Sequence, residues 1–272
     1  MGIEIQTNTS SLNSLRNLNR TNNAQNTGFQ RQSSGYRINS AKDDAAGLII
    51  SNQLSSEIVS QNIGIRNAND GISIAQVAEG ALQEVTNVLL RTRELALSAA
   101  SGQNSSDGRA ALNAEFQALG DEVSRIAGDT EFGGQALLSD DNSFNIQTGS
   151  DTGDSVALQT PNVTDVASAL SSLDISTSGG AAAALDVIDA QLAEIDTARA
   201  GLGASQNRLT STISNLQNTI ENTSASRSQI RDADIAREAS DRTKNRLLQD
   251  VGLAVLGQAN VSRQAALQLL GG

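Results

Sequence analysis

The stretch LDVIDAQLAEIDTARAGLGASQNRLTSTISNLQNTI, residues 185–220, carries the strongest structural signal in this sequence. Its apolar residues recur at alternating spacings of three and four, and only Arg199 and Gln206 interrupt the series. A heptad pattern kept over this length is typical of a coiled coil. At about 1.5 Å of rise per residue, it predicts a helix about 54 Å long that needs a partner along its whole length. The series consists of Leu185, Ile188, Leu192, Ile195, Leu202, Leu209, Ile213, Leu216 and Ile220.

The first half of the chain supplies candidate partner helices. Two apolar stripes with helical spacing flank the polar segment SGQNSSDG, residues 101–108. In that segment we expect one helix to end and another to begin at an N-cap, Ser106 or Asp107. Two antiparallel helices joined by a short loop follow from this arrangement. The stripes are Ile74, Ala78, Ala81, Val85, Val88, Leu95 and Ala99, then Leu112, Phe116, Leu119, Val123 and Ile126.

Between the two halves the helical period fails. Residues 144–160 predict a small β-hairpin, because FNIQTG and VALQT alternate apolar and polar side chains around the turn-rich SDTGD. The following run, residues 163–184, is rich in Ser, Thr, Ala and Gly, so we expect a loop or a reduced insertion there. Serines and threonines at 143–178 are candidates for O-linked glycans, although any polar loop has this composition.

The composition excludes most enzyme classes. The chain has no cysteine and no histidine, which removes disulfides, thiolate nucleophiles, His-based triads and nearly all zinc chemistry. We therefore expect no enzyme, no cofactor and no metal site. Asp43 and Asp44 are adjacent, and adjacent carboxylates point apart on a helix, so capping or intersubunit ion pairs are expected of them. The single proline, Pro161, leaves two long arms free to form uninterrupted helices.

The net charge of −11 is unevenly distributed. Residues 1–43 carry five basic and two acidic side chains, residues 231–272 carry six and five, and the middle therefore carries −15. An acidic middle repels nucleic acid and anionic lipid, so we expect neither as a partner. No stretch approaches the roughly 20 apolar residues of a membrane span. MGIEIQTNTS, residues 1–10, also lacks the basic and apolar regions of a secretory signal, so we expect any export to use another route.

The two ends have sparser apolar stripes that suit amphipathic helices. Each has little partner surface to offset an ordering cost of about 1 to 2 kcal/mol per residue. We therefore expect them to become ordered by pairing with each other and with neighbouring chains, rather than by folding onto their own core. The terminal assembly positions we single out are Leu12, Leu15, Leu18, Leu248, Val251, Val255 and Leu269.

Long strings of this sequence closely resemble bacterial flagellins. Two lie in the N-terminal half, SSGYRINSAKDDAAGLIIS (33–51) and RNANDGISIAQVAEGAL (66–82). Three lie in the C-terminal half: LGASQNRL (202–209), ISNLQNTIENTSASRSQIRDADIARE (213–238) and VLGQAN (255–260). The resemblance covers nearly the whole chain outside roughly 140–184. The chain departs from the common flagellin pattern at Gln32 and Tyr36, where Leu is usual, and at Arg263, where Pro is frequent.

The resemblance implies a mainly α fold, a long antiparallel coiled-coil rod with a small β-hairpin. Both termini would be helical and packed together in the filament. Residues 1–43 and 231–272 would form an inner core domain and residues 44–230 an outer core domain, in a short form without large variable outer domains. The implied function is that of a structural subunit that self-assembles into the flagellar filament used for swimming.

The same resemblance implies partners and a location. The subunit would cross the flagellar type III export channel unfolded with a chaperone, assemble beneath a filament cap, and belong to the secreted, extracellular flagellum beside hook-junction proteins. LLRTRELALSAASG, residues 89–102, resembles the segment that a flagellin-sensing Toll-like receptor recognises. That likeness marks Arg91, Leu95 and Glu115 as a subunit interface or a receptor-recognition site.

Two alternatives remain open at this point. A hook–filament junction protein shares terminal similarity, and polymer length would separate it from a flagellin. An adhesin or secreted immune ligand would leave swimming intact when deleted. A flagellin carrying a metalloprotease is excluded, because that chemistry needs an HExxH string and the chain has no histidine.

Overall fold

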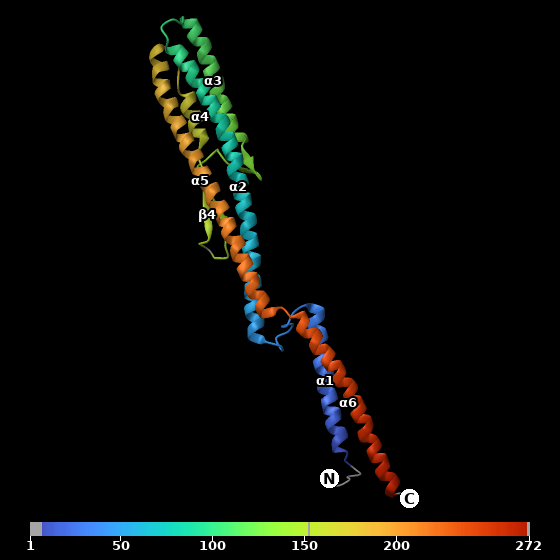
Figure 1. Cartoon of the computed structure of the whole chain (residues 1–272). Helices are drawn as coiled ribbons and strands as arrows, with labels where there is room; N and C mark the ends of the chain where they lie inside the picture. Colours follow the sequence, from blue (N-terminus) through green and yellow to red (C-terminus); the bar gives the residue numbers. More distant parts are fainter. Residues whose placement is uncertain (1–6, 152, 271–272) are drawn as a thin grey trace. The chain divides into compact units, whose positions relative to one another are not determined.

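The computed structural model describes residues 7–151 and 153–270, with side chains described except at 262–270, and this part of the chain is mainly helical (Figure 1). The helices are α1 (Thr9–Ser34), α2 (Ala45–Ala100), α3 (Ser106–Asp129), α4 (Val163–Ser171), α5 (Ser178–Arg231) and α6 (Ile235–Leu270). The strands are β1 (Glu131–Phe132), β2 (Gln135–Ala136), β3 (Asn142–Gln147) and β4 (Ser155–Thr160).

The chain divides into two compact units. One consists of Met1–Ser56 with Asn222–Gly272, and the other of Glu57–Glu221. The division falls inside α2 and α5, so each of these helices contributes to both units. The inner and outer core domains implied by the flagellin resemblance stay a prediction.

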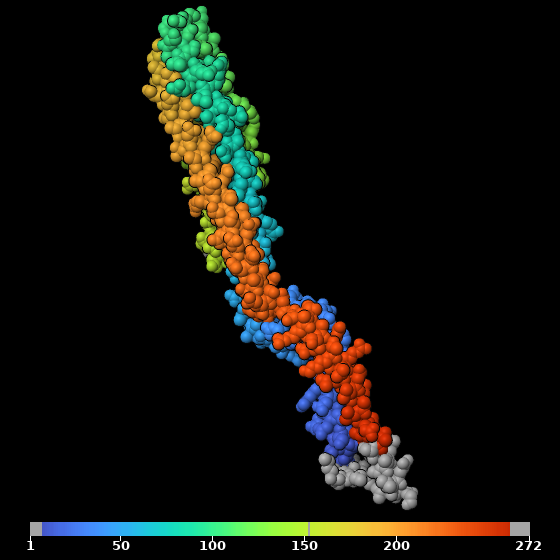
Figure 2. Space-filling model, viewed as in Figure 1, coloured from blue at the N-terminus to red at the C-terminus, as the bar shows by residue number. Residues whose placement is uncertain are grey.

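In the second unit, α2 and α5 lie side by side as the predicted coiled coil (Figure 1). The fully buried positions of α5 recur every seven residues, which keeps one face of the helix against its partner. Buried positions of α2 alternate at spacings of three and four along the same core. The space-filling view shows the two helices in continuous contact along this unit (Figure 2). The buried positions include Ala181, Ile188, Ile195, Leu202 and Leu209 of α5, and Ala75, Ala78, Leu82, Val85 and Leu89 of α2.

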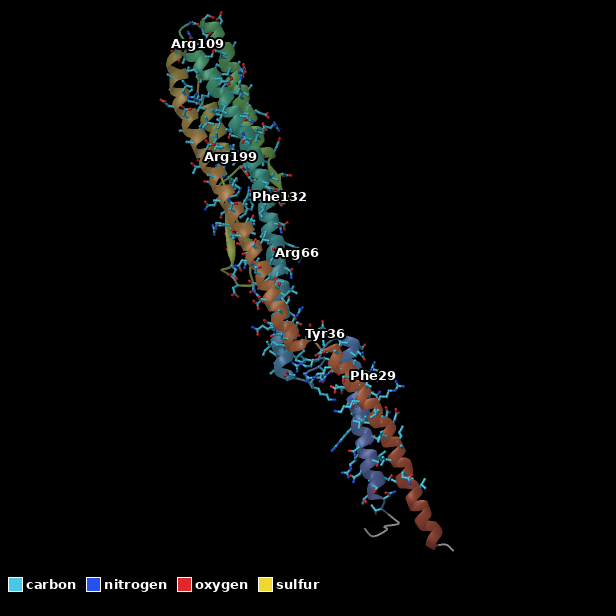
Figure 3. All side chains as sticks on the ribbon, in the orientation of Figure 1. Phe29, Tyr36, Arg66, Arg109, Phe132 and Arg199 are labelled. Atoms are coloured by element: carbon cyan, nitrogen blue, oxygen red, sulfur yellow. The ribbon has the colours of Figure 1, made fainter. Side chains whose placement is uncertain are left out.

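Arg199 and Gln206, the two polar residues that interrupt the apolar series of α5, form hydrogen bonds to α2. Arg199 lies on α5 (Figure 3), and its Nη2 donates to Oε1 of Gln83 on α2 at 2.6 Å. Nε2 of Gln206 donates to Oε2 of Glu79 at 3.1 Å. Because each bond joins one position of α5 to one position of α2, the pair specifies the register of the antiparallel helices.

Helix α3 returns along α2, as the loop at 101–108 predicts. Its N-cap is Ser105, whose hydroxyl accepts from the N–H of Gly108 at 3.1 Å. The sequence predicted the N-cap one or two residues later, at Ser106 or Asp107. Phe116 and Val123 are fully buried in the same core as α2 and α5. The antiparallel helix pair is confirmed.

The prediction of a loop over residues 163–184 was wrong. The segment contains α4 and the first turns of α5. Asn162 caps α4 by accepting from the N–H of Thr164 at 3.0 Å. The apolar face of α4 lies in the main core, and the alanines that resembled loop composition are good helix formers. The buried residues of this segment are Val163, Val166, Ala167, Leu170, Ala181 and Ala184.

Side chains of α3 hold the link between α4 and α5. Nε2 of Gln117 donates to the carbonyl oxygen of Leu173 at 2.6 Å, and Nε of Arg109 donates to that of Ser176 at 3.2 Å. Arg109 and Gln117 lie eight residues apart and therefore on one helical face. The link also buries Ile175 and packs Leu173 against the core, so polar and apolar contacts together order it.

The predicted β-hairpin is confirmed in β3 and β4. The strands are antiparallel, with Phe144 opposite Leu158. The hairpin is tied to α2, because Nδ2 of Asn67 donates to the carbonyl oxygen of Gln147 at 2.8 Å. The short antiparallel pair of β1 and β2 was not predicted from the sequence.

In the first unit, α1 and α6 lie side by side, and both terminal helices are confirmed (Figure 1). Helix α1 begins after Asn8, which accepts from the N–H of Ser11 at 3.0 Å, and ends at Gly35 with φ of 76°. Oδ1 of Asp234 accepts from the N–H groups at the start of α6. None of the 26 residues of α1 is buried. Helix α1 therefore has no line of buried apolar residues like the one that joins α2 and α5 in the second unit, which we call the rod.

Candidate assembly and recognition surfaces

Helices α1 and α6 expose apolar side chains along their lengths. Five of the seven terminal positions singled out from the sequence are between 44% and 51% exposed, and Leu18 is half-buried. The side chain of the seventh, Leu269, lies outside the described part of the chain. Exposed apolar residues gathered on one helix pair are typical of an interaction surface. The five exposed residues are Leu12, Leu15, Leu248, Val251 and Val255.

In the structure, Arg91 and Glu115 are in contact at the surface, whereas Leu95 is buried. Nη2 and Nε of Arg91 donate to Oε1 of Glu115 at 2.8 and 3.2 Å. Nη1 of Arg91 also donates to Oε2 of Glu94 at 2.9 Å. The hydrogen bond to Glu115 raises the pKa of Arg91 above its ordinary value. Leu95 is 3% exposed, so it supports this surface from within the core.

Other charged pairs of the rod were missed at the level of sequence. Nε of Arg93 donates to Oδ1 of Asp189 at 2.7 Å and joins α2 to α5. That hydrogen bond holds the pKa of Asp189 below its ordinary value. No local signal predicts this pair, because 96 residues separate its members.

Arg125 lies between two carboxylates of its own helix. Its Nη2 is 2.5 Å from Oε1 of Glu122 and its Nη1 is 2.7 Å from Oδ2 of Asp129. Spacings of three and four on a helix were the available signal for these pairs. They border a hollow of about 460 Å³ between α2 and α3 that also includes Glu84 and Val88.

Of the adjacent aspartates before α2, Asp44 caps the helix and Asp43 closes the turn that precedes it. Oδ1 of Asp44 accepts from the N–H of Gly47 at 2.9 Å. Oδ2 of Asp43 accepts from the N–H groups of Ser40 and Asn39 at 3.0 and 3.1 Å. The N–H of Ser40, followed by that of Asn39, lowers the pKa of Asp43. Each carboxylate thus has its own backbone partners, and the predicted capping role fits Asp44.

Within residues 7–151 and 153–270, no group of three or more acidic, His or Cys side chains is placed to hold a metal ion. Over the same described residues, no helix is long and apolar enough to cross a membrane. Some hydroxyls considered for glycosylation are inaccessible, since Thr148 and Thr160 are buried.

Family comparisons agree with this arrangement of terminal helices and rod. Residues 5–143 match the bacterial flagellin N-terminal helical region, and residues 185–270 match the bacterial flagellin C-terminal helical region. The chain belongs to the bacterial flagellin family. As a flagellin, it is a structural subunit of the flagellar filament, the polymer of bacterial motility.

Full-length relatives bear this out. A flagellin of Halalkalibacterium halodurans is 42% identical over 269 residues, covering 98% of this chain and 99% of the relative. Flagellin B of Vibrio cholerae serotype O1 is 34% identical in an alignment of 376 positions that covers both chains completely. Because this chain has 272 residues, the Vibrio flagellin contains sequence that is absent here. Against that relative, this chain is a short flagellin.

Solved structures share the fold. The crystal structure of Bacillus cereus flagellin matches with a TM-score of 0.51 and 29% identity, covering 56% of this chain and 88% of the other. A Vibrio parahaemolyticus structure assigned as a flagellar hook-associated protein matches with a TM-score of 0.58 and 14% identity, covering 70% and 100%. At that identity only the fold is shared. The family assignment therefore rests on the sequence matches and not on the shared fold.

Proposed function

We propose that the exposed apolar stripes of α1 and α6 are the surfaces through which copies of this flagellin associate in the filament. The observation that carries the proposal is that α1 has no buried residue, while Leu12 and Leu15 of α1 and Leu248 of α6 stay about half exposed. Covering such surface stabilises a contact by about 25 cal/mol per Å². A patch that meets a different patch on its neighbour does not close into a ring, so repetition produces a helical polymer.

The proposal extends to the route by which the subunit arrives. The subunit crosses the type III export channel unfolded with a chaperone, assembles beneath the filament cap, and connects to the hook through junction proteins. It then works outside the cell, without catalytic activity of its own. Membership of the flagellin family supports the route, and a chain without Cys or His supports the absence of catalysis. Residues 1–43 and 231–272 form the inner core domain in this proposal, and 44–230 the outer one.

The Arg91–Glu115 pair is the second proposed contact surface, between subunits or with a flagellin-sensing Toll-like receptor. Both side chains are about half exposed while bonded to each other. Leu95, one helical turn from Arg91 on α2, is buried in the core that lies behind this helix. A rigid, charged surface on a packed core is a suitable target for a protein partner, because little side-chain freedom is lost when it binds.

Electron microscopy of the purified full chain, refolded and then seeded or salted out, tests the assembly surfaces. We expect long filaments from the unmodified chain and from Asn19→Ser, an exposed polar change on α1. Leu15→Ser and Val251→Ser should raise the concentration needed for polymerisation. Polymerisation of both serine variants at the unmodified concentration would exclude these stripes. Short stubs or persistent monomers from the unmodified chain would count against assembly through these stripes.

A receptor-reporter assay, run beside polymerisation, tests the charged pair. Arg91→Ala should lower receptor signalling, filament formation or both. Arg93→Ala is the matched control, because Arg93 is an exposed arginine two residues away that bonds to α5. Equal effects of the two substitutions would show that only general charge matters, and would refute a site at Arg91.

A further inference from the structure

The hollow between α2 and α3 combines apolar and acidic side chains. Three carboxylates and one guanidinium, that of Arg125, line its volume of about 460 Å³, which leaves an excess of two negative charges. In the described part of the chain Glu84 forms no ion pair, and its Oε2 accepts from Nδ2 of Asn87 at 3.5 Å. A side chain with an apolar stem and a positive charge would therefore fit this hollow. The carboxylates are those of Glu84, Glu122 and Asp129, and the apolar lining includes Ala81, Val88 and Ile126.

The hollow lies on the flank of α2 that faces away from α5. Thr92 is buried, and its two neighbours in the sequence bond to different helices. Arg91, the residue before it, bonds to α3, whereas Arg93, the residue after it, bonds to α5. Successive residues of a helix project about 100° apart, so residues that precede a buried position share the flank of Arg91. Glu84 and Val88 each precede a buried residue, which places the hollow on the side of α3.

Arg208 lies on the flank of α5 that faces away from α2. Asp189 follows the buried Ile188, and its bond to Arg93 shows that this flank of α5 is turned toward α2. Arg208 instead precedes the buried Leu209, which occupies the same heptad position as Ile188. It therefore projects from the opposite flank of α5. The hollow and Arg208 thus face opposite sides of the rod.

Arg208 is also unusual among the arginines of the rod. Five of the seven arginines in Glu57–Glu221 donate hydrogen bonds from their guanidinium groups. The other two are Arg208 and Arg66 (Figure 3), and within residues 7–151 and 153–261 no hydrogen bond or ion pair involves either side chain. Arg208 is exposed, and the residues three and four positions away from it are small, so its side chain protrudes from the flank. These small residues are Ala204, Ser205, Ser211 and Thr212.

We propose that Arg208 of one copy of this chain inserts into the hollow of a second copy and pairs with Glu84 there. Because the two partners lie on opposite sides of the rod, the contact is heterologous and repeats from copy to copy without closing. Most of the rod is acidic, so rods placed at other offsets bring like charges together, and the contact selects one offset. The inference rests on the association proposed above, and it adds a contact on the rod that is separate from α1 and α6.

This contact fixes the offset between neighbouring rods. Leu209 is level with Gly71, because a Cβ added at Gly71 would lie 3.2 Å from Cδ1 of Leu209. The distance along α2 from Gly71 to Glu84 is about 20 Å, at about 1.5 Å per residue. Neighbouring rods in a filament should therefore be offset by about 20 Å along their axis, to within the length of an arginine side chain. Helical reconstruction from electron micrographs measures this offset, and filaments in which Arg208 faces no hollow would overturn the proposal.

A steric variant tests the hollow without changing charge. Gly80 lines the hollow, and nothing lies within 4 Å of a Cβ added there. Gly80→Leu should therefore leave the fold of the single chain intact, fill part of the hollow and raise the critical concentration for polymerisation. Gly203→Leu is the matched control, because Gly203 of α5 is equally open and lies outside the hollow. An unchanged critical concentration for Gly80→Leu would count against insertion of Arg208.

Charge reversal with rescue tests the pairing itself. The critical concentration of the full chain is measured by sedimentation of filaments, after circular dichroism has shown that each variant folds. Arg208→Glu should raise it by about 2- to 30-fold, because an attraction is replaced by a repulsion of similar size. Glu84→Arg should have a similar effect. The double variant restores an opposite-charge pair at every contact and should polymerise near the unmodified concentration.

Arg66→Glu combined with Glu84→Arg is the matched control. Both double variants keep the net charge of −11, but Arg66 lies on α2 and not on the flank that carries Arg208. This control should not restore polymerisation. Equal restoration by the two double variants would show that only total charge matters, and would overturn the contact, as would loss of rescue. Both results come from a chain that polymerises unmodified, whereas an unmodified chain that forms no filaments overturns the proposed association and this contact with it.

Discussion

Two glycines of α2 should respond in opposite directions to the same substitution. A Cβ added at Gly64 would lie 2.7 Å from the carbonyl carbon of Thr148 and closer still to its oxygen, so the backbone of the hairpin has to move. At Gly80 nothing lies within 4 Å of an added Cβ. Alanine at Gly80 should therefore stabilise the helix by about 1 kcal/mol.

At Gly64 the same helical gain of about 1 kcal/mol is opposed by two costs. Overpacking against backbone costs about 1–3 kcal/mol. Displacing the hairpin also weakens the bond from Asn67 to the carbonyl oxygen of Gln147, worth about 1 kcal/mol. The sum predicts a net destabilisation of about 1–3 kcal/mol for Gly64→Ala, together with release of the hairpin from α2.

Urea unfolding of the monomer, followed by helical circular dichroism, measures both variants, and hydrogen exchange over β3 and β4 measures the hairpin. The reasoning fails if Gly64→Ala stabilises the chain as much as Gly80→Ala does while the exchange of the hairpin stays unchanged. In that case the close approach at Gly64 would be absent in solution, and the hairpin would be held by other contacts.

Three further outcomes are expected. Leu202→Ala, at a fully buried position of the rod, should cost about 2–5 kcal/mol in urea unfolding, whereas the chemically identical Leu97→Ala, at a position 60% exposed, should stay within about 0.5 kcal/mol. An NMR titration should give Asp189 a pKa below its ordinary 3.8, because of its hydrogen bond to Arg93. The contribution of Asp189 to stability is fully present above that ordinary value and is lost as pH falls through the lowered pKa, and Arg93→Ala should remove this dependence. Asn162→Ala should cost about 1 kcal/mol and speed hydrogen exchange in α4, because it removes the N-cap.

The rod could be predicted from sequence because its information is local and repeated. Each heptad of residues 185–220 repeats the same apolar positions, so a single polar residue in the series does not obscure the helical pattern. The partners of Arg199 and Gln206 could not be predicted in the same way, since they lie 116 and 127 residues earlier in the chain. Helix α4 was missed because nine residues contain too few turns to establish a period. Its identity depends on the core of α2, α3 and α5 that receives it.

The candidate recognition surface was only partly predictable. Four-residue spacing placed Arg91 and Leu95 on one side of α2, and the short loop after α2 brought Glu115 beside them. The spacing of the residues did not predict how deeply each side chain is buried. Leu95 is buried whereas Leu90 and Leu97 are 48% and 60% exposed, in a run where all three leucines look alike. Which leucines are buried depends on how α2 is rotated against α3 and α5. The sequence of α2 alone does not determine that rotation.

The two helix pairs of this flagellin use apolar residues in different ways, and this difference explains how one chain can be both a folded subunit and a polymer. Buried side chains recur at each heptad of α5 from Ala181 to Leu209, so the stability of the rod belongs to the single chain. Helix α1 buries none. In the proposed assembly, the α1–α6 pair therefore gains stability from neighbouring subunits, and that gain depends on concentration.

Charge acts against the same association. Each copy carries −11, with −15 in the middle of the chain and a small excess of positive charge at the ends. Salt screens repulsion between copies beyond about 10 Å at 0.1 M, while salting-out anions strengthen apolar burial. Salting out favours contacts made through the apolar ends, whereas screening only lowers the repulsion that the acidic middle sets against any contact between copies. The charge pattern therefore adds a reason, independent of packing, for association to begin at α1 and α6.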